Sequence, residues 1–231
     1  MTNEFEIVFE GEFPGTPEQV WDAVTTGTAG WLFPDPESGS RSEELVTEKP
    51  SRHVEREEGK DGWFNQLEQV IEPRGEGRSY LRWVHSGVFV EDWDAQYIAA
   101  TKHTEFYMHT LAEYLEHFAG KPVVYAEIEG PPESQGPGAF DPVRTALGLE
   151  ADSEAGASIS VDLPGIDAAT VEVDYADNFF IGLRTDDALY RFFGRNAFGG
   201  PVAITVHHFG AATAEGLTEQ WEPWLRGLYA N

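Results

Sequence analysis

The pattern of apolar and polar positions is most regular between residues 93 and 118. From Trp93 onward, mostly apolar side chains recur at intervals of three and four residues, at positions 97, 100, 104, 107, 111, 114, 115 and 118. These intervals place them on one face of an α-helix, in a stripe roughly 120° wide. Such a broad, aromatic stripe needs a wide and curved surface to cover it. We therefore expect a helix over 93–118 that packs against a curved sheet, an arrangement that tends to leave a cavity.

Alternation and start signals predict the elements that precede this helix. Phe5, Ile7 and Phe9 occupy every second position, as in a half-buried strand. Thr16, followed by a proline and then by Gln19, is a typical helix start. A second helical piece or apolar turn is expected near residues 30–34. Further strands are predicted over 42–48, 53–58, 63–71 and 78–85.

This order of a strand, two helical pieces, a run of antiparallel strands and a long terminal helix resembles the helix-grip fold of the START and Bet v-type (SRPBCC) superfamily. Four segments are similar to its AHSA-type branch, which is named after an activator of a heat-shock ATPase: PEQVW at 17–21, GWFNQL at 62–67, VHSGVF at 84–89 and HTEFYMHTL at 103–111. The resemblance covers residues 3–120. It implies an α+β fold in which a curved antiparallel sheet surrounds a long C-terminal helix. This scaffold hosts lipid carriers, polyketide cyclases, self-resistance proteins and co-chaperones, so it leaves function open.

The second half of the chain repeats parts of the first. Residues 206–207 (VH) end a strand before the last helix, as residues 84–85 do, and 221–228 match 111–118 in their apolar positions. The chain is thus predicted to contain two tandem helix-grip-like domains, 1–120 and a smaller, degenerate copy over 121–231. In the second copy the predicted strands are 123–128, 157–163, 169–175, 179–184 and 202–208, and the predicted helices are 141–149, 186–195 and 214–229.

Composition and charge narrow the classes of function. Hydrophobic residues make up 41% of the 231 residues, enough for a packed core. With 41 acidic against 15 basic residues, the net charge of −26 repels phosphate backbones and anionic membranes, so neither nucleic acid nor membrane is an expected partner. The chain has no cysteine and no run of roughly 20 apolar residues, and we expect a cytoplasmic protein.

The seven histidines are the first candidates for chemistry, because imidazole titrates near neutrality and binds metals. His103 and His109 are six residues apart on one helix, so they point in different directions around its axis. His207 and His208 are neighbours on a strand and point to opposite faces. No metal site and no cofactor are therefore expected.

A few polar side chains fall on faces that should be apolar. On its strand His85 shares a face with Trp83, either as a hydrogen-bonded core residue or as a polar group on a cavity wall. If Leu67 points inward, so do two amides of the same strand, and a buried amide needs a partner. A mostly apolar pocket with a few orienting polar groups has this composition. The predicted ligand-binding residues are Asn65, Gln69, Trp83, His85, Trp93, Tyr97, His103 and Tyr107.

Three functions fit this pattern. The first is non-enzymatic binding of a hydrophobic small molecule in an internal cavity, as a carrier, a sequestering or resistance protein, or a helper in natural-product biosynthesis. Resemblance to the superfamily implies a polyketide-like, polyene or aromatic ligand. The second is a polyketide cyclase or dehydratase that uses His85 or His103 as acid and base. The third is a co-chaperone-like interaction module, whose protein partner the sequence leaves unknown.

Overall fold

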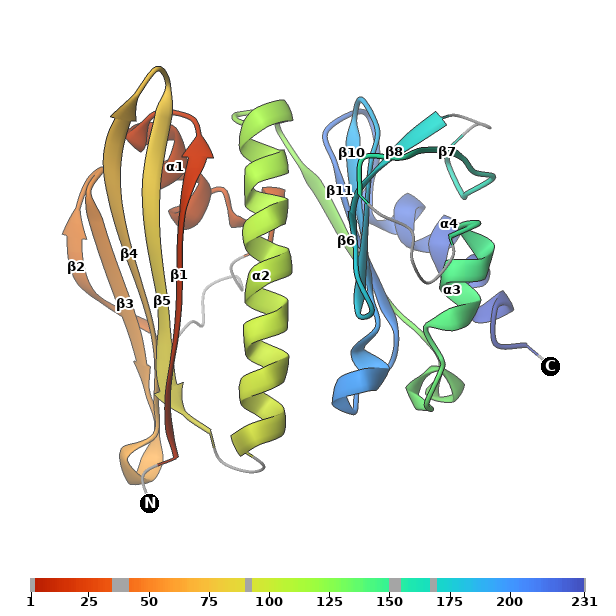
Figure 1. The fold of residues 1–231 in the computed structure, drawn as a ribbon, viewed down its shortest axis with the longest axis horizontal. Helices are drawn as coiled ribbons and strands as arrows, with labels where there is room; N and C mark the ends of the chain where they lie inside the picture. Colours follow the sequence, from red (N-terminus) through yellow and green to blue (C-terminus); the bar gives the residue numbers. More distant parts are fainter. Residues whose placement is uncertain (1–2, 35–41, 90–92, 150–154, 167–169, 231) are drawn as a thin grey trace. The chain divides into compact units, whose positions relative to one another are not determined.

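The computed structural model describes residues 3–34, 42–89, 93–149, 155–166 and 170–230. The chain divides into two compact units, Met1–Gly120 and Lys121–Asn231. Each unit combines one antiparallel sheet with helices (Figure 1), so the predicted α+β class is confirmed. In the described part of the chain, no helix has the length and apolar character needed to cross a membrane.

Unit 1 has the predicted helix-grip order. Its five strands form a sheet in the order β1-β5-β4-β3-β2, in which the first strand pairs with the last (Figure 1). The helices α1 and α2 pack on this sheet. Its elements are β1 (Glu4–Pro14), α1 (Pro17–Thr25), η1 (Thr28–Gly30), β2 (Ser42–Glu48), β3 (Arg52–Glu58), η2 (Lys60–Gly62), β4 (Phe64–Gly75), β5 (Arg78–Val88) and α2 (Trp93–His117).

Local sequence signals account for the helices of unit 1. The Thr16 hydroxyl accepts a hydrogen bond from the Gln19 backbone N–H, and the Gln19 side chain accepts one from the Thr16 N–H. This capping box fixes the start of α1. Along α2 the predicted stripe is buried in the second half of the helix, as at Leu111, but Phe106 and Met108, which lie outside the stripe, are buried as well. The buried side of α2 is therefore wider than the spacing predicts. The helix ends at His117, three residues before Gly120, whose positive φ of 77° terminates the turn.

Unit 2 repeats the order of unit 1. Its sheet has the strand order β6-β11-β10-β9-β8-β7, so again the first strand pairs with the last, and the chain ends in a helix. The terminal helix has 14 residues here against 25 in unit 1. Its elements are β6 (Val124–Glu129), η3 (Pro132–Gln135), α3 (Asp141–Ala146), β7 (Ser158–Ser160), β8 (Thr170–Ala176), β9 (Phe180–Arg184), β10 (Ala188–Phe193), η4 (Arg195–Phe198), β11 (Ala203–His208) and α4 (Ala214–Gly227).

One predicted element of unit 2 is wrong. The sequence predicts a short helix over 186–195, whereas residues 188–193 form the strand β10 between β9 and β11. All six of its residues are buried. Apolar side chains lie on both faces of this central strand, with Arg191 as its one charged residue, so its sequence lacks the alternation that identifies a half-buried strand. A short run of this kind cannot be distinguished from a helix by periodicity alone.

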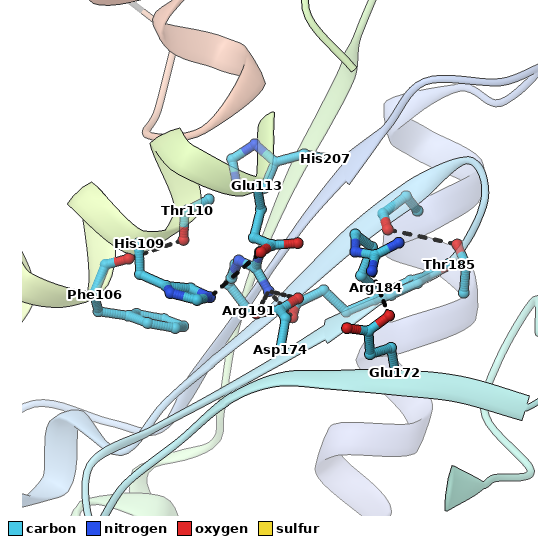
Figure 2. A network of polar contacts seen from close by, with 12 residues as sticks. Phe106, His109, Thr110, Glu113, Glu172, Asp174, Arg184, Thr185, Arg191 and His207 are labelled. Carbon is cyan, nitrogen blue, oxygen red and sulfur yellow. Dashed lines mark hydrogen bonds and ion pairs between the residues drawn. The ribbon is translucent and has the colours of Figure 1, made fainter. Parts of the chain in front are cut away.

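Unit 2 contains a buried ion pair on its sheet. Nη1 of Arg191 on β10 donates to both carboxylate oxygens of Asp174 on β8, at 2.9 and 2.8 Å (Figure 2). The strand between them carries Gly182, where a Cβ would come within 2.2 Å of Asp174 Oδ1 and 2.5 Å of Arg191 Nη1. The missing side chain of Gly182 thus provides the space in which the pair forms. Nearby, Arg184 on β9 pairs with Glu172 on the adjacent strand β8 (Figure 2).

Candidate functional site

Unit 1 contains a cavity of about 210 Å³ whose walls come from β4, β5, α2 and the segment that follows η1. Eight of its twelve lining residues are apolar or aromatic, and none is acidic, lysine or arginine. Phe33 is 49% exposed while it lines the cavity, so the cavity reaches the surface beside it. The lining residues are Trp31, Leu32, Phe33, Asn65, Leu67, Trp83, His85, Ala100, His103, Thr104, Tyr107 and Met108.

The register of the sheet brings the polar residues of the wall together. Leu67 on β4 pairs with His85 on β5, and Asn65 pairs with Gly87. Because alternate residues of a strand share a face, these side chains point to the same side as Trp83. At Gly87 a Cβ would lie 2.6 Å from the Phe64 carbonyl oxygen, so only glycine permits this close approach of the strands.

Trp31 holds in place the wall that the segment after η1 forms. Its indole Nε1 donates to the Ala23 carbonyl oxygen at 2.9 Å, and its ring meets Trp83 edge to face with 5.8 Å between centroids. Gly30, just before it, lies against the ring of Tyr114. A Cβ at position 30 would come within 2.5 Å of a carbon of that ring. The segment after η1 is thereby fixed to α1 and α2, so this wall of the cavity is preformed.

His85 and Asn65 form the polar pair of the cavity. The His85 Nε2 and Asn65 Oδ1 atoms are 2.6 Å apart, and Phe5 meets the imidazole edge to face at 4.9 Å between centroids. Burial lowers the pKa of His85 from 6.5 to about 4, so the imidazole is neutral at physiological pH. With the amide oxygen as acceptor, Nε2 carries the proton and Nδ1 keeps its lone pair.

His103 and Tyr107 lie one helical turn apart on α2, and both line the cavity. His103 Nδ1 is 2.8 Å from the Ala99 carbonyl oxygen, so Nδ1 donates and carries a proton. Its ring centroid lies 6.1 Å from that of Tyr107. The cavity therefore receives polar groups from both the sheet and the helix.

Three of the residues predicted to bind a ligand lie outside this lining. Gln69 is buried, but its amide oxygen is 3.0 Å from Nδ1 of His53, so a neighbouring strand supplies the partner that the sequence required. Trp93 and Tyr97 stack on each other at 4.8 Å between centroids, at a more open depression at the start of α2. The other five predicted residues, Asn65, Trp83, His85, His103 and Tyr107, line the cavity together.

Other lining residues were not assigned to the site from the sequence. Met108 is buried and lines the cavity, one turn beyond Thr104, but it stands outside the predicted stripe of α2. Trp31 and Phe33 are recognisable as aromatic residues of a turn, although the sequence does not show where that turn lies. A spacing of four from Thr104 is the only signal for Met108, and it does not by itself indicate a cavity. In the part of the chain that the structure describes, no three ligand-type side chains gather to hold a metal ion.

Neither a family model nor a curated protein matches this sequence. Solved structures do resemble it. A protein from Mesorhizobium loti is 20% identical, with a TM-score of 0.41 over 49% of this chain and 98% of its own. DynU16, from the dynemicin biosynthetic locus, is 15% identical, with a TM-score of 0.40 over 97% of this chain and 95% of its own. Aha1 from Colwellia psychrerythraea is 16% identical, with a TM-score of 0.39 over 48% of this chain and 96% of its own. The similar structures include SRPBCC and AHSA-type proteins, the superfamily that the sequence of unit 1 resembles. TM-scores this low support no transfer of function.

Proposed function

We propose that the protein binds a hydrophobic small molecule in the cavity of unit 1, as a carrier, a sequestering or resistance protein, or a helper in natural-product biosynthesis. A polyketide-like, polyene or aromatic compound is the ligand class. The observation that carries the proposal is the cavity itself, which reaches the surface and has a mostly apolar lining with a few polar groups, among them the His85–Asn65 pair. Ligand sites in proteins generally combine an apolar wall with a few orienting polar groups.

The state of His85 favours binding over acid–base catalysis. A catalytic base is most effective when its pKa lies near the working pH, whereas burial lowers the pKa of His85 to about 4. Its partner is the amide of Asn65 and not a carboxylate that would stabilise an imidazolium. His85 is therefore suited to accept a hydrogen bond from a ligand and poorly suited to remove a proton from one.

Calorimetric titration with naphthalene tests the proposal, with two matched variants on α2. Ala100→Phe places a ring in the cavity, while Ala95→Phe places the same ring on an exposed position of the same helix. We expect one naphthalene per chain, unchanged affinity in Ala95→Phe, and affinity lowered roughly tenfold or more in Ala100→Phe, which corresponds to about 1.4 kcal/mol. Absence of binding in the unaltered protein, or equal binding in both variants, would overturn the proposal.

A further inference from the structure

We infer that the cavity of unit 1 selects an uncharged compound of one or two aromatic rings that carries a hydroxyl group, and that the His85–Asn65 pair recognises this hydroxyl. The inference rests on the proposed function, because it specifies the ligand of the same cavity. It is drawn from three properties of the cavity: its size, the hydrogen-bonding groups of the pair, and the charge of its walls.

The size of the cavity limits the ligand. A cavity of roughly 150 Å³ in another protein interior holds a benzene molecule, and pockets for drug-sized compounds measure about 300–1,000 Å³. At about 210 Å³, this cavity lies between the two. It therefore has room for a single ring with substituents or for two fused rings, but it does not enclose a long polyene. Within the proposed ligand class, the compact aromatic compounds fit best.

The hydrogen bond between the two polar residues decides which groups they offer. Because Asn65 Oδ1 accepts from His85 Nε2, the neutral imidazole offers a lone pair on Nδ1, and the amide offers the N–H groups of its Nδ2. The pair thus contributes one acceptor and one donor to the wall on which it lies. A hydroxyl group donates through its hydrogen and accepts through its oxygen, so it can satisfy either group or both. A ligand without such a group leaves polar atoms of the wall unpaired.

The absence of a permanent charge in the described walls disfavours ionised ligands. None of the twelve described lining residues is a lysine or an arginine, so no permanent cation would compensate a carboxylate or phosphate inside the cavity. Burial, which lowers the pKa of His85, also disfavours a charged ligand group at the same place. A naphthol therefore suits the cavity better than a naphthoate of similar size.

Competing ligands test the inference in calorimetric titrations of the full chain at pH 7. We compare naphthalene, 2-naphthol and 2-naphthoate, which share the ring system and differ in the polar group. The expected order of affinity is 2-naphthol, then naphthalene, then 2-naphthoate, with 2-naphthol about 3- to 10-fold tighter than naphthalene, the range for one net hydrogen bond. In His85→Phe, which keeps a ring of similar size, the preference for 2-naphthol should fall to less than about twofold. Asn65→Leu, which removes only the amide, serves as the second variant.

The outcomes separate this inference from the proposed function. If naphthalene binds and 2-naphthol binds no better, or if 2-naphthoate binds best, the inference is overturned and the cavity remains a hydrophobic binding site. If none of the three compounds binds, both proposals fail. If 2-naphthol is preferred equally by the unaltered protein and by both variants, recognition by the His85–Asn65 pair is refuted.

Discussion

Burial of His85 makes the stability of unit 1 depend on pH. In the unfolded chain its imidazole titrates near 6.5, and in the folded unit its pKa is about 4. Between these values the unfolded state binds a proton that the folded state does not. Acidification therefore stabilises the unfolded state relative to the folded one. Stability linked to His85 is complete above about pH 7 and is lost as the pH falls through 6.5 towards 4.

The size of this effect follows from the two pKa values. Integrated between pH 7 and pH 5, the difference in proton binding amounts to a loss of roughly 2 kcal/mol in the free energy of unfolding. Hydrogen exchange of the β5 amides measures this free energy within unit 1. His85→Gln removes the titrating group and keeps a side chain that can hydrogen-bond to Asn65. His117→Gln, on the half-exposed side of α2, controls for the loss of a histidine as such.

Comparison of variants cancels the contributions of the 41 acidic residues, which all three proteins share. We expect the unaltered protein and His117→Gln to lose about 2 kcal/mol more than His85→Gln between pH 7 and pH 5. Equal pH dependence in the unaltered protein and in His85→Gln would refute the argument that burial keeps this imidazole neutral.

Three further substitutions test contacts within the units, each read out by urea unfolding with element-resolved hydrogen exchange. Trp31→Phe removes the indole hydrogen bond to the Ala23 carbonyl and should destabilise unit 1 by roughly 1–2 kcal/mol; an unchanged unit 1 would contradict this. Asp174→Ala removes the carboxylate that pairs with buried Arg191 and should destabilise unit 2 by about 3–5 kcal/mol. Loss of an exposed ion pair would cost about 1 kcal/mol or less. Gly182→Ala inserts a Cβ into the space of that ion pair and should cost roughly 1–3 kcal/mol, whereas a stabilised variant would show that the strand yields easily.

The parts of the fold that could be predicted are those with a clear period. The spacing of three and four along α2 predicted the helix and part of its buried side, and the order of elements in residues 3–120, through its resemblance to the helix-grip fold, predicted an antiparallel sheet with a long terminal helix. The strand β10 could not be predicted, because its side chains, apolar on both faces apart from Arg191, have neither the helical nor the alternating period. Which side chains pack on each face of such a strand depends on tertiary contacts, and the local sequence does not show them.

The cavity could be predicted only in part for a similar reason. Alternation along β4 shows that Asn65, Leu67 and Gln69 share a face, but it does not show what stands opposite each of them. The β3–β4 register places His53 beside Gln69, which satisfies that amide within the protein, and the β4–β5 pairing places Asn65 near His85 at the cavity. Register and the path of a turn depend on contacts distant in sequence, and a single sequence does not reveal them.

The methyl group of Met108 offers the most direct test of a ligand-binding cavity in unit 1. The chain has two methionines, Met1 and Met108, so methyl-labelled methionine gives one resonance from the terminus and one from the cavity wall. We expect titration with 2-naphthol to shift the Met108 resonance saturably, through the ring current of the bound aromatic, and to leave Met1 unchanged. The same titration of Ala100→Phe should shift Met108 little. An unchanged Met108 resonance at saturating 2-naphthol would contradict the account.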